Sequence, residues 1–211
     1  LLMDSITGET LDEYQNFLIC EGYNNTTIEN HMFAFKRILK WADEKGYLKF
    51  GSDVMKHKIK KLKIAKPTPF NYLTWKEFLK FYNYKFDELE KDLELARDRF
   101  CFCCATSLRH SDLELLKKSH FDNPDDPTSF TIVSKKTDDA PTIFLNDYSK
   151  SLYMKYKDRE TDKGLLFPRK SNQKMNKSLK KIACKLGITR EVSKTEYCGT
   201  DRSDITTRIC D

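Results

Sequence analysis

The sequence of 211 residues predicts a mainly α-helical protein of two domains, the second of which also contains a small antiparallel β-sheet. Three observations support this prediction. Apolar residues recur at helical spacing in several segments that open with a capping pattern. Two short runs rich in β-branched and aromatic residues are separated by a turn-forming segment. A proline-containing stretch divides the chain after its first third.

The helix starts are predicted by four capping boxes, in which a hydroxyl residue precedes a glutamate by three positions and satisfies free N–H groups. These boxes begin at Thr10, Thr26, Thr74 and Ser111. The second box opens an apolar stripe of Ile28, Met32, Phe35, Ile38, Leu39 and Ala42. Lysine alternates with apolar residues over 56–63, which we interpret as one more helix.

Domain boundaries follow from Lys66-Pro67-Thr68-Pro69, because two prolines disfavour helix and favour extended chain. We therefore predict a helical domain over 1–66 and a second domain over 67–211. Within the second domain, helical spacing covers 89–106, 148–156 and 172–186, with Gly187 ending the last helix. In the first of these helices we expect Leu93, Ala96, Phe100, Cys103 and Cys104 to be buried. Strand patterns cover 130–134 and 142–145.

Charge is distributed unevenly along the chain, whose formal net charge is +6. Residues 36–66 contain eleven Lys or Arg, residues 163–190 contain nine and no acidic residue, and the region between them is mildly acidic. Two basic blocks favour two contact surfaces on one polyanion, DNA or RNA. The alternative is that the lysines only solvate helix faces.

Several classes of protein are disfavoured by composition. Hydrophobic residues make up 39% of the chain, and no apolar run approaches the roughly 18 residues of a membrane span. The first residues do not form a secretory signal. The seven cysteines follow no zinc-type spacing, and Cys101, Cys103 and Cys104 lie in an apolar helical run, where cysteine usually acts as a small hydrophobe. We therefore expect a cytoplasmic protein with no membrane association and no metal site.

Arg109 is the first candidate functional residue, because it lies between two helical patterns. Its planar, permanently charged guanidinium can clamp a phosphate, and Asp112 could hold it in place. The alternative is that Arg109 only pairs with Asp112 or bonds the preceding helix carbonyls. Lys136 is the second candidate, at the bend between the strand patterns, where it could bind a phosphate or protonate a leaving oxygen. Strand alternation points Lys135 to the opposite face.

The segment Thr106–Lys117 resembles the first catalytic-arginine motif of the tyrosine recombinases, the phage and transposon integrases, with Ser107 at the usual glycine. Lys135-Lys136-Thr137 followed by 143–145 is similar to that family's β-hairpin lysine segment and places the lysine at Lys136. Residues 26–47 resemble the SAM-like core-binding domain. Residues 165–176 resemble the mid-catalytic segment of integrases from Bacteroides-type mobile elements.

This resemblance implies site-specific recombination and integration of a mobile element by DNA breakage and rejoining, without metal or nucleotide cofactor. In complete relatives a tyrosine attacks the scissile phosphate, forms a 3′-phosphotyrosyl link and releases the 5′-hydroxyl. Arg109 would neutralise the phosphate, and Lys136 would protonate the 5′-oxygen. The partner is double-stranded DNA, and the relatives act as synaptic tetramers, although we expect this chain to be a monomer. We expect DNA contacts from Thr27, His31, Arg37, Lys40, Lys135, Ser171, Lys174, Lys177 and Lys181.

The family pattern also contains a His-x-x-Arg motif, a later His or Trp, and a tyrosine nucleophile. No histidine follows His120, and Tyr197 lies in a segment that precedes that motif in relatives. We therefore expect a truncated catalytic domain that binds DNA without cleaving it. Two alternatives stay open: a regulatory or architectural DNA-binding module without catalysis, and a protein-interaction domain whose lysines only solvate it.

Overall fold

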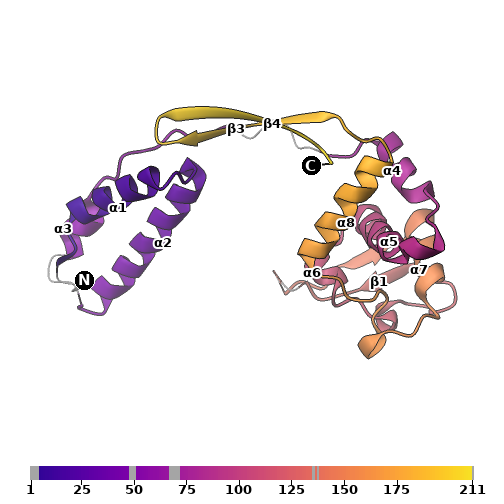
Figure 1. The fold of residues 1–211 in the computed structure, drawn as a ribbon. Helices are drawn as coiled ribbons and strands as arrows, with labels where there is room; N and C mark the ends of the chain where they lie inside the picture. The colour runs from indigo at the N-terminus through magenta and orange to yellow at the C-terminus, as the bar shows by residue number, and fades with distance from the viewer. Residues whose placement is uncertain (1–4, 48–50, 67–71, 135, 137, 211) are drawn as a thin grey trace. The chain divides into compact units, whose positions relative to one another are not determined.

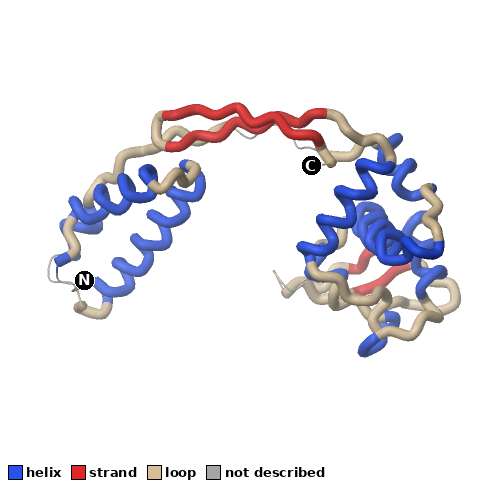
Figure 2. The backbone as a smooth tube through the Cα atoms, in the orientation of Figure 1, coloured by secondary structure: helices blue, strands red, loops and turns tan. Residues whose placement is uncertain are grey.

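The computed structural model describes residues 5–47, 51–66, 72–134, 136 and 138–210. These residues are mainly helical, with two small two-stranded antiparallel sheets (Figure 2), which confirms the predicted fold class. The chain divides into two compact units. One comprises Leu1–Asn71 with Val192–Thr207, and the other comprises Tyr72–Glu191 with Arg208–Asp211.

The first unit contains α1 (Gly8–Cys20), α2 (Asn25–Glu44) and α3 (Gly51–Lys56), packed around Leu11, Leu18, Ile28, Leu39 and Val54. The predicted helix starts at Thr10 and Thr26 are each wrong by two or three residues. Thr7 is the N-cap of α1, and its backbone N–H donates to Thr10 Oγ1 at 3.1 Å. Asn24 is the N-cap of α2, and its side chain accepts from Thr27 N at 2.8 Å.

Two other predictions for the first unit are wrong. The side chain of Ile38, assigned to the buried stripe of α2, is 54% exposed. The predicted helix over 56–63 does not form, since α3 ends at Lys56 and residues 57–66 belong to no helix or strand. The alternation of lysine and apolar residues has the period of two that suits extended backbone. Side-chain amides replace the helical hydrogen bonds there, with Gln15 Nε2 donating to Lys60 O at 3.0 Å and Asn25 Nδ2 to Lys63 O at 2.8 Å.

The second unit is built around α5 (Lys91–Thr106), which packs against α4 (Trp75–Asn83), α7 (Asp147–Tyr156) and α8 (Asn172–Lys185), as Figure 1 shows. The helices predicted over 89–106, 148–156 and 172–186 are therefore confirmed. The Thr74 capping box is also confirmed, with Thr74 N donating to Glu77 Oε2 at 2.7 Å. Shorter elements connect these helices: η2 (Glu88–Glu90), α6 (His110–Leu113), η3 (Lys118–His120) and η4 (Asp162–Gly164).

The predicted β-hairpin is present but shorter than expected. β1 (Ser129–Thr131) pairs antiparallel with β2 (Thr142–Phe144), with Phe130 opposite Ile143. Phe130 is buried in the core of the unit and tilts against Phe102 of α5 with ring centroids 6.1 Å apart. The hairpin is thereby anchored to the central helix, and its far end leads to the turn that contains Lys136.

Two predictions for the second unit are wrong. Cys104, assigned to the buried side of α5, is exposed. Ala96 is buried as predicted, and Cys101 and Phe102 are buried as well, because α5 has neighbours on several sides. The Ser111 capping box does not form either. Arg109 is the N-cap of α6, two residues earlier than that box requires.

A second hairpin, absent from the sequence-based prediction, is formed by β3 (Glu191–Cys198) and β4 (Asp201–Arg208). Residues 192–207 of this hairpin belong to the first unit. Its turn is fixed by Asn25, whose side chain accepts from Gly199 N at 2.7 Å and donates to Gly199 O at 2.8 Å. Tyr197 lies in β3, and the Lys63 ammonium lies 4.9 Å from its ring centroid.

Candidate nucleic-acid interface

Arg109 is placed by a sharp change of direction between α5 and α6. α5 ends at Thr106, and Ser107 adopts left-handed backbone angles (φ 57°, ψ 19°). Leu108 is buried in the core and anchors the turn. Arg109 then caps α6, and its carbonyl oxygen accepts from Asp112 N and Leu113 N, both at 3.0 Å. The backbone of Arg109 is therefore fixed while its side chain is left to reach outward.

The side chain of Arg109 is half exposed, and Ser134 and Asp112 hold its guanidinium. Its Nη1 donates to Ser134 Oγ at 3.1 Å and lies 4.0 Å from Asp112 Oδ2. Ser134 Oγ in turn donates to Asp112 Oδ2 at 3.4 Å. Ser134 and Asp112 are buried, whereas the side chain of Arg109 is 54% exposed. The arrangement orients a cation at the surface, with donors still available to a ligand.

Lys136 lies in the turn that Ser134 closes. Ser134 N donates to Asp139 O at 2.7 Å, and Asp138 N donates to Ser134 O at 3.0 Å. Lys136 is exposed and lies two positions after the serine that bonds Arg109. The hydrogen bond from Arg109 to Ser134 thus places the start of the lysine turn beside the arginine. That both side chains share one phosphate stays a prediction, and Lys135 lies outside the described residues.

A buried group of charged residues connects α5 and α6, and the sequence analysis did not predict it. Arg99, in the middle of α5, has no exposed surface and donates to the Glu114 carboxylate and to Pro168 O. Burial lowers the pKa of the Arg99 guanidinium, and the charge of Glu114 opposes this shift. His110 Nε2 lies 3.6 Å from the same carboxylate. Glu114, assigned to a capping box, therefore ties α6 to α5.

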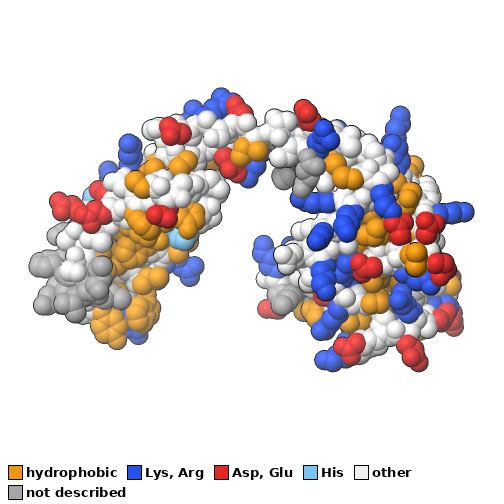
Figure 3. Space-filling view, viewed as in Figure 1, with side chains coloured by type: hydrophobic (Ala, Val, Ile, Leu, Met, Phe, Trp, Pro, Cys, Tyr) orange, Lys and Arg blue, Asp and Glu red, His pale blue; other side chains and the backbone are white. Residues whose placement is uncertain are grey.

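α8 carries the second group of predicted DNA-binding residues. Ser171 is its N-cap, and the Ser171 hydroxyl accepts from Lys174 N at 3.4 Å. Lys174, Lys177 and Lys181 are exposed, and Lys and Arg side chains gather over α8 in Figure 3. Lys185, at the end of the helix, is instead paired with Glu90. The three exposed lysines form a basic row that we call the α8 lysines.

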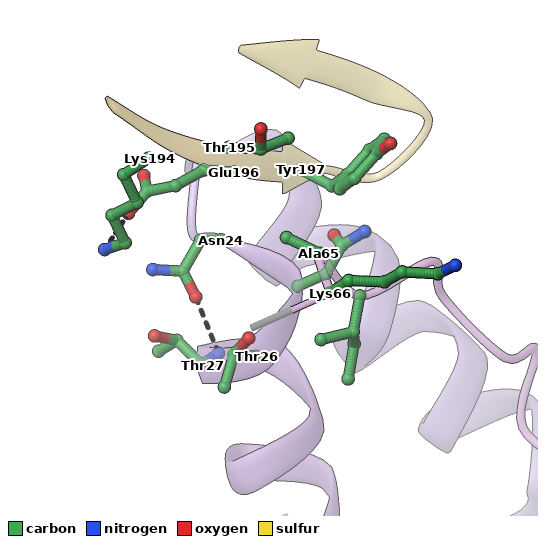
Figure 4. Close-up of a pocket in the computed structure, with 11 residues that line it drawn as sticks. Asn24, Thr26, Thr27, Ala65, Lys66, Lys194, Thr195, Glu196 and Tyr197 are labelled. Atoms are coloured by element: carbon green, nitrogen blue, oxygen red, sulfur yellow. Dashed lines mark hydrogen bonds and ion pairs between the residues drawn. The ribbon is translucent and has the colours of Figure 1, made fainter. Parts of the chain in front are cut away.

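The predicted residues of the first unit all lie on α2. Thr27 is half-buried in its first turn, next to a pocket formed by the start of α2, residues 64–66 and β3 (Figure 4). His31 is exposed, with its Nδ1 3.3 Å from the Tyr14 hydroxyl. Arg37 is exposed, and the Lys40 ammonium lies 3.9 Å from the Glu44 carboxylate. Three of these four residues are therefore on the open surface of the helix.

No helix in the described part of the chain combines the length and the apolar content that crossing a membrane requires. No family model matches the sequence, and no curated protein matches it.

Solved structures do resemble the chain. The Tn1549 transposon integrase in complex with circular intermediate DNA has a TM-score of 0.63 and 14% sequence identity, over 88% of this chain and 66% of that one. The lambda integrase tetramer bound to a Holliday junction has a TM-score of 0.61 and 16% identity, over 89% and 55%. The XerH site-specific recombinase bound to a palindromic difH substrate has a TM-score of 0.64 and 17% identity, over 93% and 56%.

The chain therefore has the tyrosine recombinase and integrase fold. It spans 55% to 66% of the length of these three structures.

Proposed function

We propose that the chain is the DNA-binding portion of a site-specific recombinase or integrase, and that residues 1–211 bind duplex DNA without cleaving it. The observation that carries this proposal is the half-exposed guanidinium of Arg109, held by buried Ser134 and Asp112 beside the Lys136 turn. The three solved structures with the same fold hold a circular intermediate DNA, a Holliday junction and a palindromic difH substrate. The site and the fold therefore support the same class of ligand.

Arg109 and Lys136 take different roles in this proposal. The guanidinium presents several N–H donors in a plane and suits the non-bridging oxygens of a phosphodiester. In a complete enzyme it would neutralise charge that develops on the phosphate during attack, an effect worth several kcal/mol in comparable oxyanion sites. Lys136 would donate a proton to the departing 5′-oxygen. We assign DNA backbone contacts to the α8 lysines and to Arg37, which are exposed.

Duplex binding is the first test. The affinity of residues 1–211 for a duplex of about 30 base pairs should fall steeply between about 50 and 200 mM salt, because each neutralised phosphate releases counterions. Arg109→Ala should make the slope of log K against log salt less steep, by the amount expected for the loss of about one phosphate contact. Arg159→Ala, which removes an exposed arginine on the same unit beside Tyr156, serves as the control and should leave the slope unchanged.

Cleavage is tested on a nicked suicide substrate, on which we expect no covalent protein–DNA adduct from residues 1–211. An adduct would contradict the assignment of DNA binding without cleavage. A slope that Arg109→Ala leaves unchanged would remove Arg109 from the interface. The second candidate, a regulatory or architectural DNA-binding module, predicts only a small loss of affinity for Arg109→Ala and no effect on cleavage in a longer version of the protein.

A further inference from the structure

The Ser134 hydroxyl lies between the guanidinium of Arg109 and the carboxylate of Asp112 and is hydrogen-bonded to both. It accepts from Arg109 Nη1 at 3.1 Å and donates to Asp112 Oδ2 at 3.4 Å. The direct separation of Nη1 and Oδ2 is 4.0 Å, which is too long for a hydrogen bond. The hydroxyl therefore bridges a long ion pair whose two charged groups are not directly hydrogen-bonded.

The backbone of Ser134 has a second task in the same place. Its N–H and its carbonyl oxygen close the turn that contains Lys136, through Asp139 O at 2.7 Å and Asp138 N at 3.0 Å. One buried residue thus fixes the guanidinium with its side chain and the lysine turn with its main chain. A change at this side chain acts on Arg109 while the backbone hydrogen bonds of the turn stay in place.

We infer that Ser134 is a positioning residue for phosphodiester binding, which keeps Arg109 available to DNA by holding its guanidinium 4.0 Å from the Asp112 carboxylate, beyond direct hydrogen-bond distance. This inference rests on the proposed function, since it takes Arg109 as a phosphate ligand. Removal of the hydroxyl lets the flexible arginine close onto the buried carboxylate. An arginine engaged bidentately by a carboxylate has fewer donors left for a phosphate.

The test uses residues 1–211 and a duplex of about 30 base pairs, with affinities measured over a range of salt. Ser134→Ala should weaken binding about tenfold and lower the salt slope by about one contact, as Arg109→Ala does. The double variant should be no weaker than Arg109→Ala alone, because both changes remove the same contact. Ser134→Thr keeps a donor and an acceptor and should restore wild-type binding.

Ser129→Ala is the matched control, since it removes a hydroxyl from the same hairpin that donates to Asp122 at 3.2 Å, away from Arg109. It should bind like the wild type. The guanidinium ¹⁵N resonances of Arg109, assigned with Arg109→Lys, report the local change in free protein. They should shift in Ser134→Ala and return in Ser134→Thr.

The outcomes separate the two proposals. If Arg109→Ala lowers the salt slope and Ser134→Ala does not, the role of Ser134 is wrong and the proposed function stands. If the losses of the two single variants add in the double variant, Ser134 does not act through Arg109 and the inference is also wrong. If Arg109→Ala leaves binding unchanged, Arg109 does not bind a phosphate. Both the proposed function of Arg109 and the role inferred for Ser134 are then wrong.

Discussion

Ser107 occupies a backbone conformation that suits glycine. Its φ of 57° ends α5 in the left-handed region, where a Cβ atom crowds the following carbonyl at a cost of roughly 1–2 kcal/mol. Its side chain is exposed, so a substitution loses no buried contact. The catalytic-arginine motif that this segment resembles usually has glycine here, and the left-handed turn before Arg109 gives a physical reason for glycine at this position.

We therefore expect Ser107→Gly to increase the free energy of unfolding by about 1 kcal/mol, because it removes this strain. Urea denaturation would measure the change. Ser107→Val should do the opposite, since a β-branched side chain is least compatible with positive φ. A glycine variant no more stable than the wild type would show that the turn carries little strain.

Individual residues of the candidate site differ in how far they could be predicted from the sequence. Arg109 could be proposed from the sequence because the segment around it is contiguous and lies between recognisable helices. Ser134 was not, because its role depends on a hydrogen bond to a residue 25 positions away. Arg99 was missed for a related reason: in sequence it is one charge in an apolar run, and only the packing of α5 makes it fully buried beside Glu114.

At the scale of elements, the helices with a clear period of 3.6 were predicted, and the segments that depend on distant partners were not. Residues 57–66 form neither helix nor strand, and their carbonyl groups at Lys60 and Lys63 accept from the side-chain amides of Gln15 and Asn25. The β3–β4 hairpin has little apolar patterning, and β4 is exposed along its whole length. The hairpin is attached to the first unit through hydrogen bonds between Asn25 and Gly199, and a contact between residues so far apart cannot be predicted from local sequence.

Asn25 makes that attachment, so its loss should release the hairpin turn. The buried amide bonds both backbone groups of Gly199 and also Lys63 O. Asn25→Ala leaves these groups without partners and should cost about 2–3 kcal/mol. Amide hydrogen exchange at Gly199 should become much faster, which measures the release locally.

Asn24→Ala is the neighbouring control for this prediction. Asn24 caps α2 through Thr27 N, so its loss should cost about 1 kcal/mol without exposing Gly199. Equal exchange at Gly199 in the two variants would mean that general destabilisation, and not the loss of the Asn25 contact, frees the hairpin.

For the whole molecule, the uneven distribution of charge along the sequence favoured a polyanion partner. The count of basic residues, however, exceeds the number that are unpaired and exposed among the described residues, because some form ion pairs within the protein. Of the basic block at 163–190, Lys170 pairs with Asp92, Lys185 with Glu90 and Arg190 with Glu77. These pairs join elements of the second unit and serve its stability. The α8 lysines are the exposed remainder on which the DNA-binding proposal depends, together with Arg109.

Replacing all three α8 lysines, Lys174, Lys177 and Lys181, with alanine should therefore lower the salt slope of duplex binding by about two to three contacts. The fold should persist, because these positions are exposed on the polar side of α8. A second triple variant carries the same change in net charge at Lys91, Lys150 and Lys157, whose ammonium groups already pair with Glu88, Asp126 and Asp125. Equal losses of slope in the two variants would mean that net charge alone drives binding, whereas a loss confined to the α8 lysines identifies that helix face as a track for DNA phosphates.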